Sequence, residues 1–225
     1  MTSKDLDIAV IKRPSIPSPE RKYREKEVEG RHGKLYEDLK TYEDIEVNVE
    51  FNFLATDPGQ WNNIFRRAKK WINNIKDRKL KFSDDLSFFY LVNKSFISSS
   101  ERDFKRLGKF EVTFICEPFM YLESGLDEIP ISTTIYNDFE ETQPIYTITG
   151  EGLLTLTCNG KTVTANIGQN LIINTKSGLS YRVDGTPRNS DVTGDLKDLF
   201  LLEGNNTFSY TNGFTIKLVP NWRCL

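Results

Sequence analysis

The chain has 225 residues, 38% of them apolar and 12% aromatic, which is enough for packed cores in one large domain or two modest ones. Its 30 basic and 32 acidic residues give a net charge of -2. No field of one sign covers the molecule, so nucleic acid is not expected as its main partner. No apolar run suits a signal peptide or a membrane span, and the three cysteines lie far apart. We therefore expect folding in a cytosol, reduced cysteines and no membrane partner.

Residues 4–11 predict a short strand, and the basic, proline-rich segment 12–34 follows it. Because proline fixes φ and lacks an N–H donor, residues 13–20 are expected to be extended and solvated. Two glycines, Gly30 and Gly33, then predict a turn between two ribbon-like strands. A surface hairpin without a further role is one interpretation of this composition. The other is an arm that reaches for a second surface, since the segment has too little apolar content to fold on itself.

Residues 45–53 alternate strictly between apolar and polar side chains, which predicts a half-buried strand. A helix is predicted next, with Asp57 as N-cap and Pro58 at its first position. Apolar residues then recur at steps of three and four, and this stripe must dock on a sheet. The stripe comprises Trp61, Ile64, Phe65, Ala68, Trp71, Ile72 and Ile75.

Three further strands are predicted at residues 79–82, 86–93 and 109–116, with a loop or irregular edge at 95–108. Together with the helix they indicate an α+β unit, a β-sandwich with one helix laid across it. The pattern breaks at residues 117–130 and again in the polar stretch 137–144, which together predict a linker. From residue 145 onward everything indicates strands, with two-residue hairpins predicted at Asn159-Gly160 and Asn212-Gly213. We therefore expect a mainly β protein whose second domain is a sandwich or jelly roll.

Residues with the chemistry of an active site are sparse. His32 is the only histidine, so a His-dependent triad or His-rich metal site is not expected. No phosphate-binding glycine motif occurs, and the acidic pairs Asp84-Asp85 and Glu140-Glu141 lie in predicted turns, where solvated charge is the simpler interpretation. We expect no enzyme, and no catalytic, cofactor-binding or metal site.

The prolines, the basic segment, the phrase EVEGRHGKLYED and the strand ending in FNF resemble the N-terminal domain of the distal tail proteins of long-tailed, non-contractile bacteriophages. The resemblance implies a ring-forming domain at residues 1–135, with an extended arm at about 12–38 that embraces the neighbouring subunit. It also implies a galectin-like β-sandwich at residues 136–225. The residues implied in subunit contact are Arg13, Pro14, Pro17, Pro19, Arg21, Arg24, Gly30, Arg31 and Gly33.

The same resemblance implies a structural protein of the virion, located at the tail tip. Such a protein forms a homo-hexamer, as one ring or two stacked rings, and contacts the tail tube protein, a tail-associated hub protein and receptor-binding or side-fibre proteins. Basic residues of the arm would contact acidic neighbours: Arg21, Lys22, Arg24, Lys26 and Arg31. The alternative function is a carbohydrate-binding accessory subunit of a tail tip. Against it, the second domain has no histidine, and its one tryptophan is Trp222.

Overall fold

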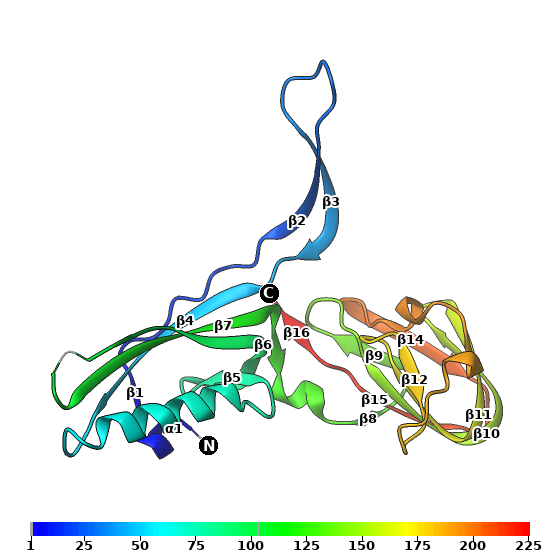
Figure 1. Ribbon diagram of the computed structural model, residues 1–225. Helices are drawn as coiled ribbons and strands as arrows, with labels where there is room; N and C mark the ends of the chain where they lie inside the picture. Colours follow the sequence, from blue (N-terminus) through cyan, green and yellow to red (C-terminus); the bar gives the residue numbers. More distant parts are fainter. Residues whose placement is uncertain (1, 103) are drawn as a thin grey trace. The chain divides into compact units, whose positions relative to one another are not determined.

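The computed structural model describes residues 2–102 and 104–225, and the chain divides into two compact units. Unit 1 comprises residues 1–84, 90–120 and 225, and unit 2 comprises residues 85–89 and 121–224. Strands dominate both, and the one α-helix lies in unit 1 (Figure 1). The expected mainly β fold class with a single packed helix is therefore confirmed. No helix in the described residues has the length and apolar character needed to cross a membrane.

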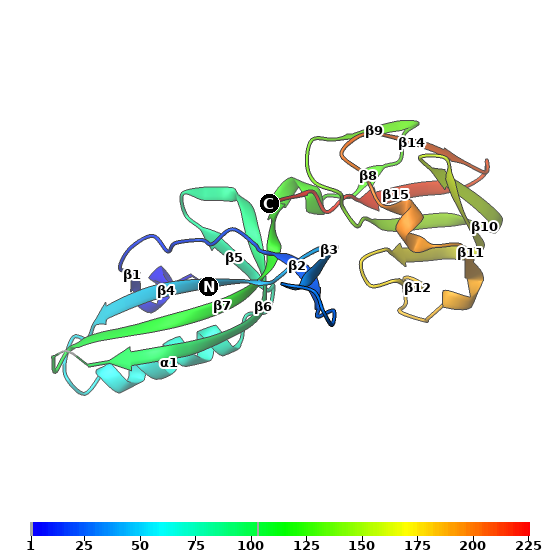
Figure 2. The same cartoon turned by 90° about the horizontal axis from the view of Figure 1, so that it is seen from above.

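Unit 1 is built around one sheet in the order β1-β4-β7-β6-β5. Figures 1 and 2 both show α1 running along this sheet. Besides the two strands of the arm, the elements are η1 (Lys4–Leu6), β1 (Ala9–Val10), β4 (Ile45–Leu54), α1 (Trp61–Asn73), β5 (Lys79–Phe82), β6 (Asp85–Glu101) and β7 (Leu107–Leu122).

The alternation in β4 sets the core of unit 1. Its five apolar side chains are buried between the sheet and α1, and the predicted strand is thereby confirmed. Phe51 stacks on Phe110 of β7, with centroids 5.2 Å apart, and Trp71 of α1 meets Phe51 edge-on at 6.2 Å. The apolar stripe of α1 therefore docks on the sheet, as its spacing predicts.

The start of α1 differs from the sequence expectation. The helix begins at Trp61, with Gln60 as an N-cap that makes no side-chain hydrogen bond. Oδ1 of Asp57 instead accepts the N–H groups of Gly59 at 2.8 Å and Gln60 at 3.2 Å. Asp57 and Pro58 thus form a turn ahead of the helix, because the aspartate satisfies a local turn as readily as a helix end. The predicted cap at Asp57 is wrong by one turn.

Residues 95–108, predicted as a loop or an irregular strand edge, are mostly strand. β6 continues to Glu101 and β7 resumes at Leu107. At this end of β6, Phe96 and the serines at 98–100 are exposed and Ile97 packs against the core, so the strand lacks a continuous apolar face. Of the two interpretations, the strand is therefore the correct one.

Unit 2 contains only strands and short 3-10 turns. They are η2 (Glu123–Leu126), β8 (Ile129–Pro130), β9 (Thr134–Asn137), β10 (Ile145–Cys158), β11 (Lys161–Asn174), β12 (Leu179–Tyr181), η3 (Asn189–Asp191), β13 (Val192–Thr193), η4 (Leu196–Leu199), β14 (Gly204–Tyr210), β15 (Thr215–Val219) and β16 (Arg223–Cys224).

A long hairpin, β10–β11, organises this unit. The two strands pair along their whole length, and the Asn159-Gly160 turn between them has φ of 50° and 79°, which confirms the predicted hairpin. The first half of β10 pairs with β15 and the last part pairs with β14. Between these parts, Gly150 and Gly152 have φ of 152° and 106°. These glycines allow β10 to bend, so that its first part pairs with β15 and its last part pairs with β14.

The second predicted hairpin, at Asn212-Gly213, is wrong. Among the described residues, β14 pairs with β10 and β9, whereas β15 pairs with β10 and β8. The two strands therefore follow each other in sequence but lie beside different parts of β10. An Asn-Gly turn specifies a tight reversal, but only the register of the flanking strands decides whether they pair.

The predicted linker, residues 117–130 with 137–144, is not unstructured. Residues 117–130 complete β7 and form η2 and β8, which pairs with β15. Between the two parts, Ile131 and Ile135 are buried in the core of unit 2, and β9 pairs with β14. The proposed domain division at residue 135 stays a prediction.

Candidate assembly arm

The arm begins with a segment that is held on its own unit. Arg13 forms an ion pair with Asp84 and lies 5.3 Å from the centre of the Phe82 ring. Pro14 is buried, and Ile16 packs against the core of unit 1. Within this chain, Arg13 and Pro14 therefore anchor the arm at its base.

The arm continues into a hairpin of two strands, β2 (Arg21–Lys26) and β3 (Leu35–Tyr42). Before it, Pro17 is exposed and Pro19 is half-buried. Glu43 donates its backbone N–H to the carbonyl of Glu20 at 2.8 Å, which closes the hairpin at its base. In the part of the chain that the structure describes, these strands form a sheet of their own (Figure 1). The ribbon expected around Gly30 and Gly33 is thus present.

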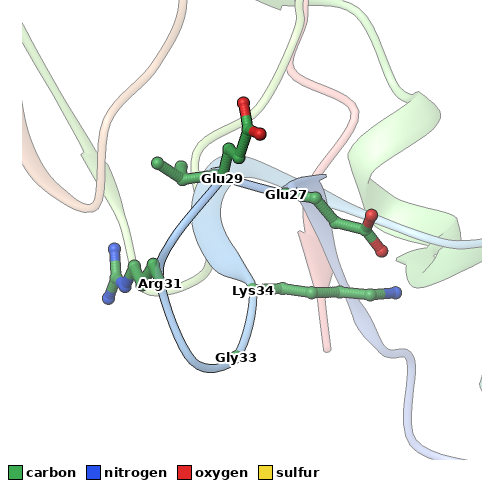
Figure 3. Close-up of a pocket in the computed structure, with 6 residues that line it drawn as sticks. Glu27, Glu29, Arg31, Gly33 and Lys34 are labelled. Atoms are coloured by element: carbon green, nitrogen blue, oxygen red, sulfur yellow. The ribbon is translucent and has the colours of Figure 1, made fainter.

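The hairpin turns through a wide loop whose side chains point outward. Gly30 and Gly33 have φ of 79° and 78°, and an added Cβ at either would meet no atom within 4 Å. These glycines serve the backbone conformation of the turn rather than a close approach within the chain. Figure 3 shows Arg31 and Lys34 directed to opposite sides of this loop. Arg31 has no ion-pair partner among the described residues.

Four ion pairs bridge the hairpin and its base. They are Arg21–Asp38 at 3.0 Å, Lys22–Glu43 at 3.2 Å, Arg24–Glu37 at 3.4 Å and Lys34–Glu25. Three of the five basic residues expected to reach acidic neighbours are thus paired inside the arm. Pairs this exposed contribute little to stability, and they can exchange partners on docking.

A bulge shapes the lower end of the hairpin. Lys40 has a φ of 55°, and its backbone N–H donates to Oδ1 of Asp38 at 2.7 Å. This hydrogen bond, together with the Arg21 guanidinium, lowers the pKa of Asp38. The hydrogen bond to Asp38 in turn raises the pKa of Arg21. Both groups are therefore charged at neutral pH and hold the strands in register.

Most apolar side chains of the hairpin remain exposed, while Tyr42 at its base is half-buried and meets Phe119 edge-on at 5.8 Å. Tyr23 and Tyr36 are 51% and 59% exposed, and their rings touch edge-on. Val28, Leu35 and Leu39 are also exposed. An isolated two-stranded hairpin is marginally stable in water. The arm therefore presents apolar surface that its own chain leaves open to another surface.

Sequence reasoning located the arm but not these features. The tyrosine pair was not singled out, because the two residues are not directly opposite each other: Tyr23 pairs with Asp38, and Tyr36 pairs with Glu25. His32 is exposed in the loop, and no cluster of three or more potential metal ligands occurs in the described residues.

Comparison with known proteins decides the family of the first unit. Residues 6–116 match the model of the phage tail protein RIFT-related domain. These residues belong to the phage tail RIFT-related domain family. The matched range holds the whole arm, β4, α1 and most of β7. The resemblance of this chain to distal tail proteins is thereby confirmed.

The phage tail fold extends over both units. The crystal structure of the Dit protein of phage SPP1 is similar with a TM-score of 0.60, over 94% of this chain and 90% of that chain, at 16% identity. That protein is described as a paradigm of the hub adsorption apparatus in phages that infect Gram-positive bacteria. No curated protein matches this sequence. At such low identity the likeness shows a shared fold.

Proposed function

We propose that this protein is the distal tail hub of a long-tailed phage, a structural component that closes into a hexameric ring. The ring would link the tail tube to the tail-tip and host-adsorption proteins. The observation that supports this most is the arm, an ordered hairpin on which Tyr23, Tyr36 and further apolar side chains are exposed. A neighbouring copy supplies the missing surface, and every interface of a closed ring then gains the same contact.

The sheet of unit 1 supports the same proposal through its edges. Ile11 donates its N–H to the carbonyl of Glu50 at 2.9 Å. Beyond this point, no described backbone group pairs with the outer edge of β4 at residues 45–49. At the opposite end of the sheet, β5 pairs only with β6 in the described chain. One sheet with two open edges suits head-to-tail pairing, which forms a ring if the rotation closes.

The two units take different roles in this proposal. Residues 1–135 form the ring, while residues 136–225 form a galectin-like domain that meets the receptor-binding or side-fibre proteins. The tail tube protein and the tail-associated hub protein bind the ring itself. The subunits form one ring or two stacked rings. The contact residues proposed in the arm are Pro17, Pro19, Arg21, Arg24, Gly30, Arg31 and Gly33, with Arg13 and Pro14 anchoring its base.

Carbohydrate binding by unit 2 is the second candidate. It is favoured by Tyr136, which is 60% exposed on β9 and pairs across the strands with the exposed Asn205. An exposed ring beside polar side chains can stack on a sugar. Titration with wall polysaccharide, using Tyr136→Ala as the control, tests this candidate. Equal signals from both proteins would remove it.

Electron microscopy of the purified protein tests the proposed ring directly. Images are collected for the protein alone and for its mixture with the tail tube protein. Six-fold rings in either sample support the hub function. Single particles of monomer size in both samples would contradict it.

A further inference from the structure

The positive charge of this chain is concentrated in one short stretch. Residues 61–81 contain eight lysines and arginines and a single acid, Asp77, although the whole chain has a net charge of -2. The rest of the chain is correspondingly acidic. The near-neutral net charge of the chain therefore includes one strongly basic stretch. The net charge of the whole chain does not argue against nucleic acid binding at this stretch.

Helix α1 carries the centre of this surface. Arg66, Arg67, Lys69 and Lys70 are all exposed on the side that faces away from the sheet. No ion pair with an acid is formed by any of the four among the described residues. Arg66 lies 3.4 Å from the side-chain oxygen of Asn63, and Lys69 lies over the Phe65 ring at 4.7 Å. These contacts leave the four positive charges uncompensated.

The other exposed residues of this face are amides. They are Asn62, Asn63, Asn73 and Asn74, with Lys76 just beyond the helix. The exposed face thus consists of asparagine, lysine and arginine, without an exposed large apolar residue. Protein–protein interfaces are depleted of lysine at their centres and enriched in aromatic residues. Arginine, lysine and asparagine are instead the side chains that contact phosphate oxygens.

We propose that this face of α1 binds the phosphate backbone of double-stranded DNA without sequence specificity. The four basic residues rise about 6 Å along the helix axis from Arg66 to Lys70, so their long side chains can reach neighbouring phosphates of one strand, which are spaced about 3.4 Å along the duplex axis. Single-stranded nucleic acid requires exposed aromatic rings for base stacking, and this face has none. The proposal is independent of ring formation, since one subunit carries the complete surface.

Fluorescence anisotropy with a labelled duplex of about 20 base pairs tests the proposal. Four phosphate contacts predict that the affinity falls about 100-fold between about 50 mM and about 200 mM salt. The variant with Arg66, Arg67, Lys69 and Lys70 all changed to Gln should lose this binding and the salt dependence. Its melting temperature should stay unchanged, because all four side chains are exposed.

A matched variant removes the same charge from unit 2 by changing Lys161, Arg182, Lys197 and Lys217 to Gln. It should bind the duplex as the unaltered protein does. Equal binding by both quadruple variants would overturn the proposal, as would the absence of binding at about 50 mM salt. Polyglutamate of equal charge concentration is the competitor. If it binds more tightly than the duplex, the face fits an acidic protein and the proposal is wrong.

Discussion

The rings of Tyr23 and Tyr36 meet edge-on across the hairpin of the arm, with centroids 6.4 Å apart and planes at 88°. Both residues are nevertheless more than half exposed. The contact fixes the orientation of two large side chains before any partner arrives, which lowers the entropic cost of docking. Aromatic residues that are ordered in advance are the usual centres of binding energy at interfaces.

Replacing both tyrosines with serine should therefore impair assembly without unfolding the protein. The free energy of unfolding should change by less than about 1 kcal/mol, since neither side chain is in the core. The association should weaken by at least about 2 kcal/mol, or roughly 30-fold. Tyr136→Ser with Tyr210→Ser is the matched control in unit 2. Unchanged assembly of the Tyr23 and Tyr36 variant, by light scattering, would show that the pair is not at the interface.

The hairpin should also depend on pH through Asp38. Its pKa is lowered by the Lys40 N–H and by Arg21, so its contribution is complete above the ordinary carboxyl value of 3.8 and is lost as pH falls through the lowered pKa. NMR titration should show the Lys40 amide shifting together with the Asp38 carboxyl below that pH. In Asp38→Asn the shift should vanish. A Lys40 amide that stays constant to low pH would contradict the hydrogen bond.

The more deeply a cysteine is buried, the more slowly its thiol should react with an alkylating reagent. Burial raises the pKa of Cys116 to about 12 and that of Cys158 to about 11, so both remain thiols at neutral pH. Cys224 is only half-buried, although its pKa is also raised. Mass spectrometry after mild alkylation should find Cys224 modified alone, and all three modified in denaturant. Native-state labelling of Cys116 or Cys158 at the rate of Cys224 would contradict the packing of the cores.

The sequence predicted elements best where burial follows a regular period. The alternation of β4 and the stripe of α1 are fixed by the need to bury one face, so both were found from spacing alone. The Asn159-Gly160 turn was found because its backbone requires positive φ. Strand partners depend on distant residues, which is why the pairing of β14 and β15 was not predictable. The last residues of β6 show no regular alternation between buried and exposed side chains, so spacing alone could not predict this part of the strand.

The arm illustrates the same limit at the functional site. Its prolines and glycines restrict the backbone locally, so an extended segment and a turn could be predicted from Pro17, Gly30 and Gly33. The anchoring of Pro14 could not, because it depends on the folded surface of unit 1. Nor does the sequence tell which basic residues are paired, since pairing depends on the hairpin register.

The second unit should need residues before the predicted boundary at 135. A fragment of residues 121–225 keeps β8 and the buried side chains of Ile131 and Ile135, whereas residues 136–225 lack them. Losing two buried isoleucines costs about 4 kcal/mol or more. Thermal melts followed by circular dichroism should show a clearly higher midpoint for the longer fragment. Equal midpoints would place the boundary where the sequence predicts it.

The central claim is that the hairpin joins copies of this chain into a ring. Because Glu20 and Glu43 are joined by a backbone hydrogen bond, a short glycine-serine linker can replace residues 22–41, which keeps the contact of Tyr42 with Phe119 in unit 1. Multi-angle light scattering then measures the mass of both proteins, alone and with the tail tube and hub proteins. The full chain should have the mass of a hexamer in at least one condition, and the shortened chain that of a monomer in all of them. A full-length chain that stays monomeric throughout, or a shortened chain that still forms the hexamer, would contradict the claim.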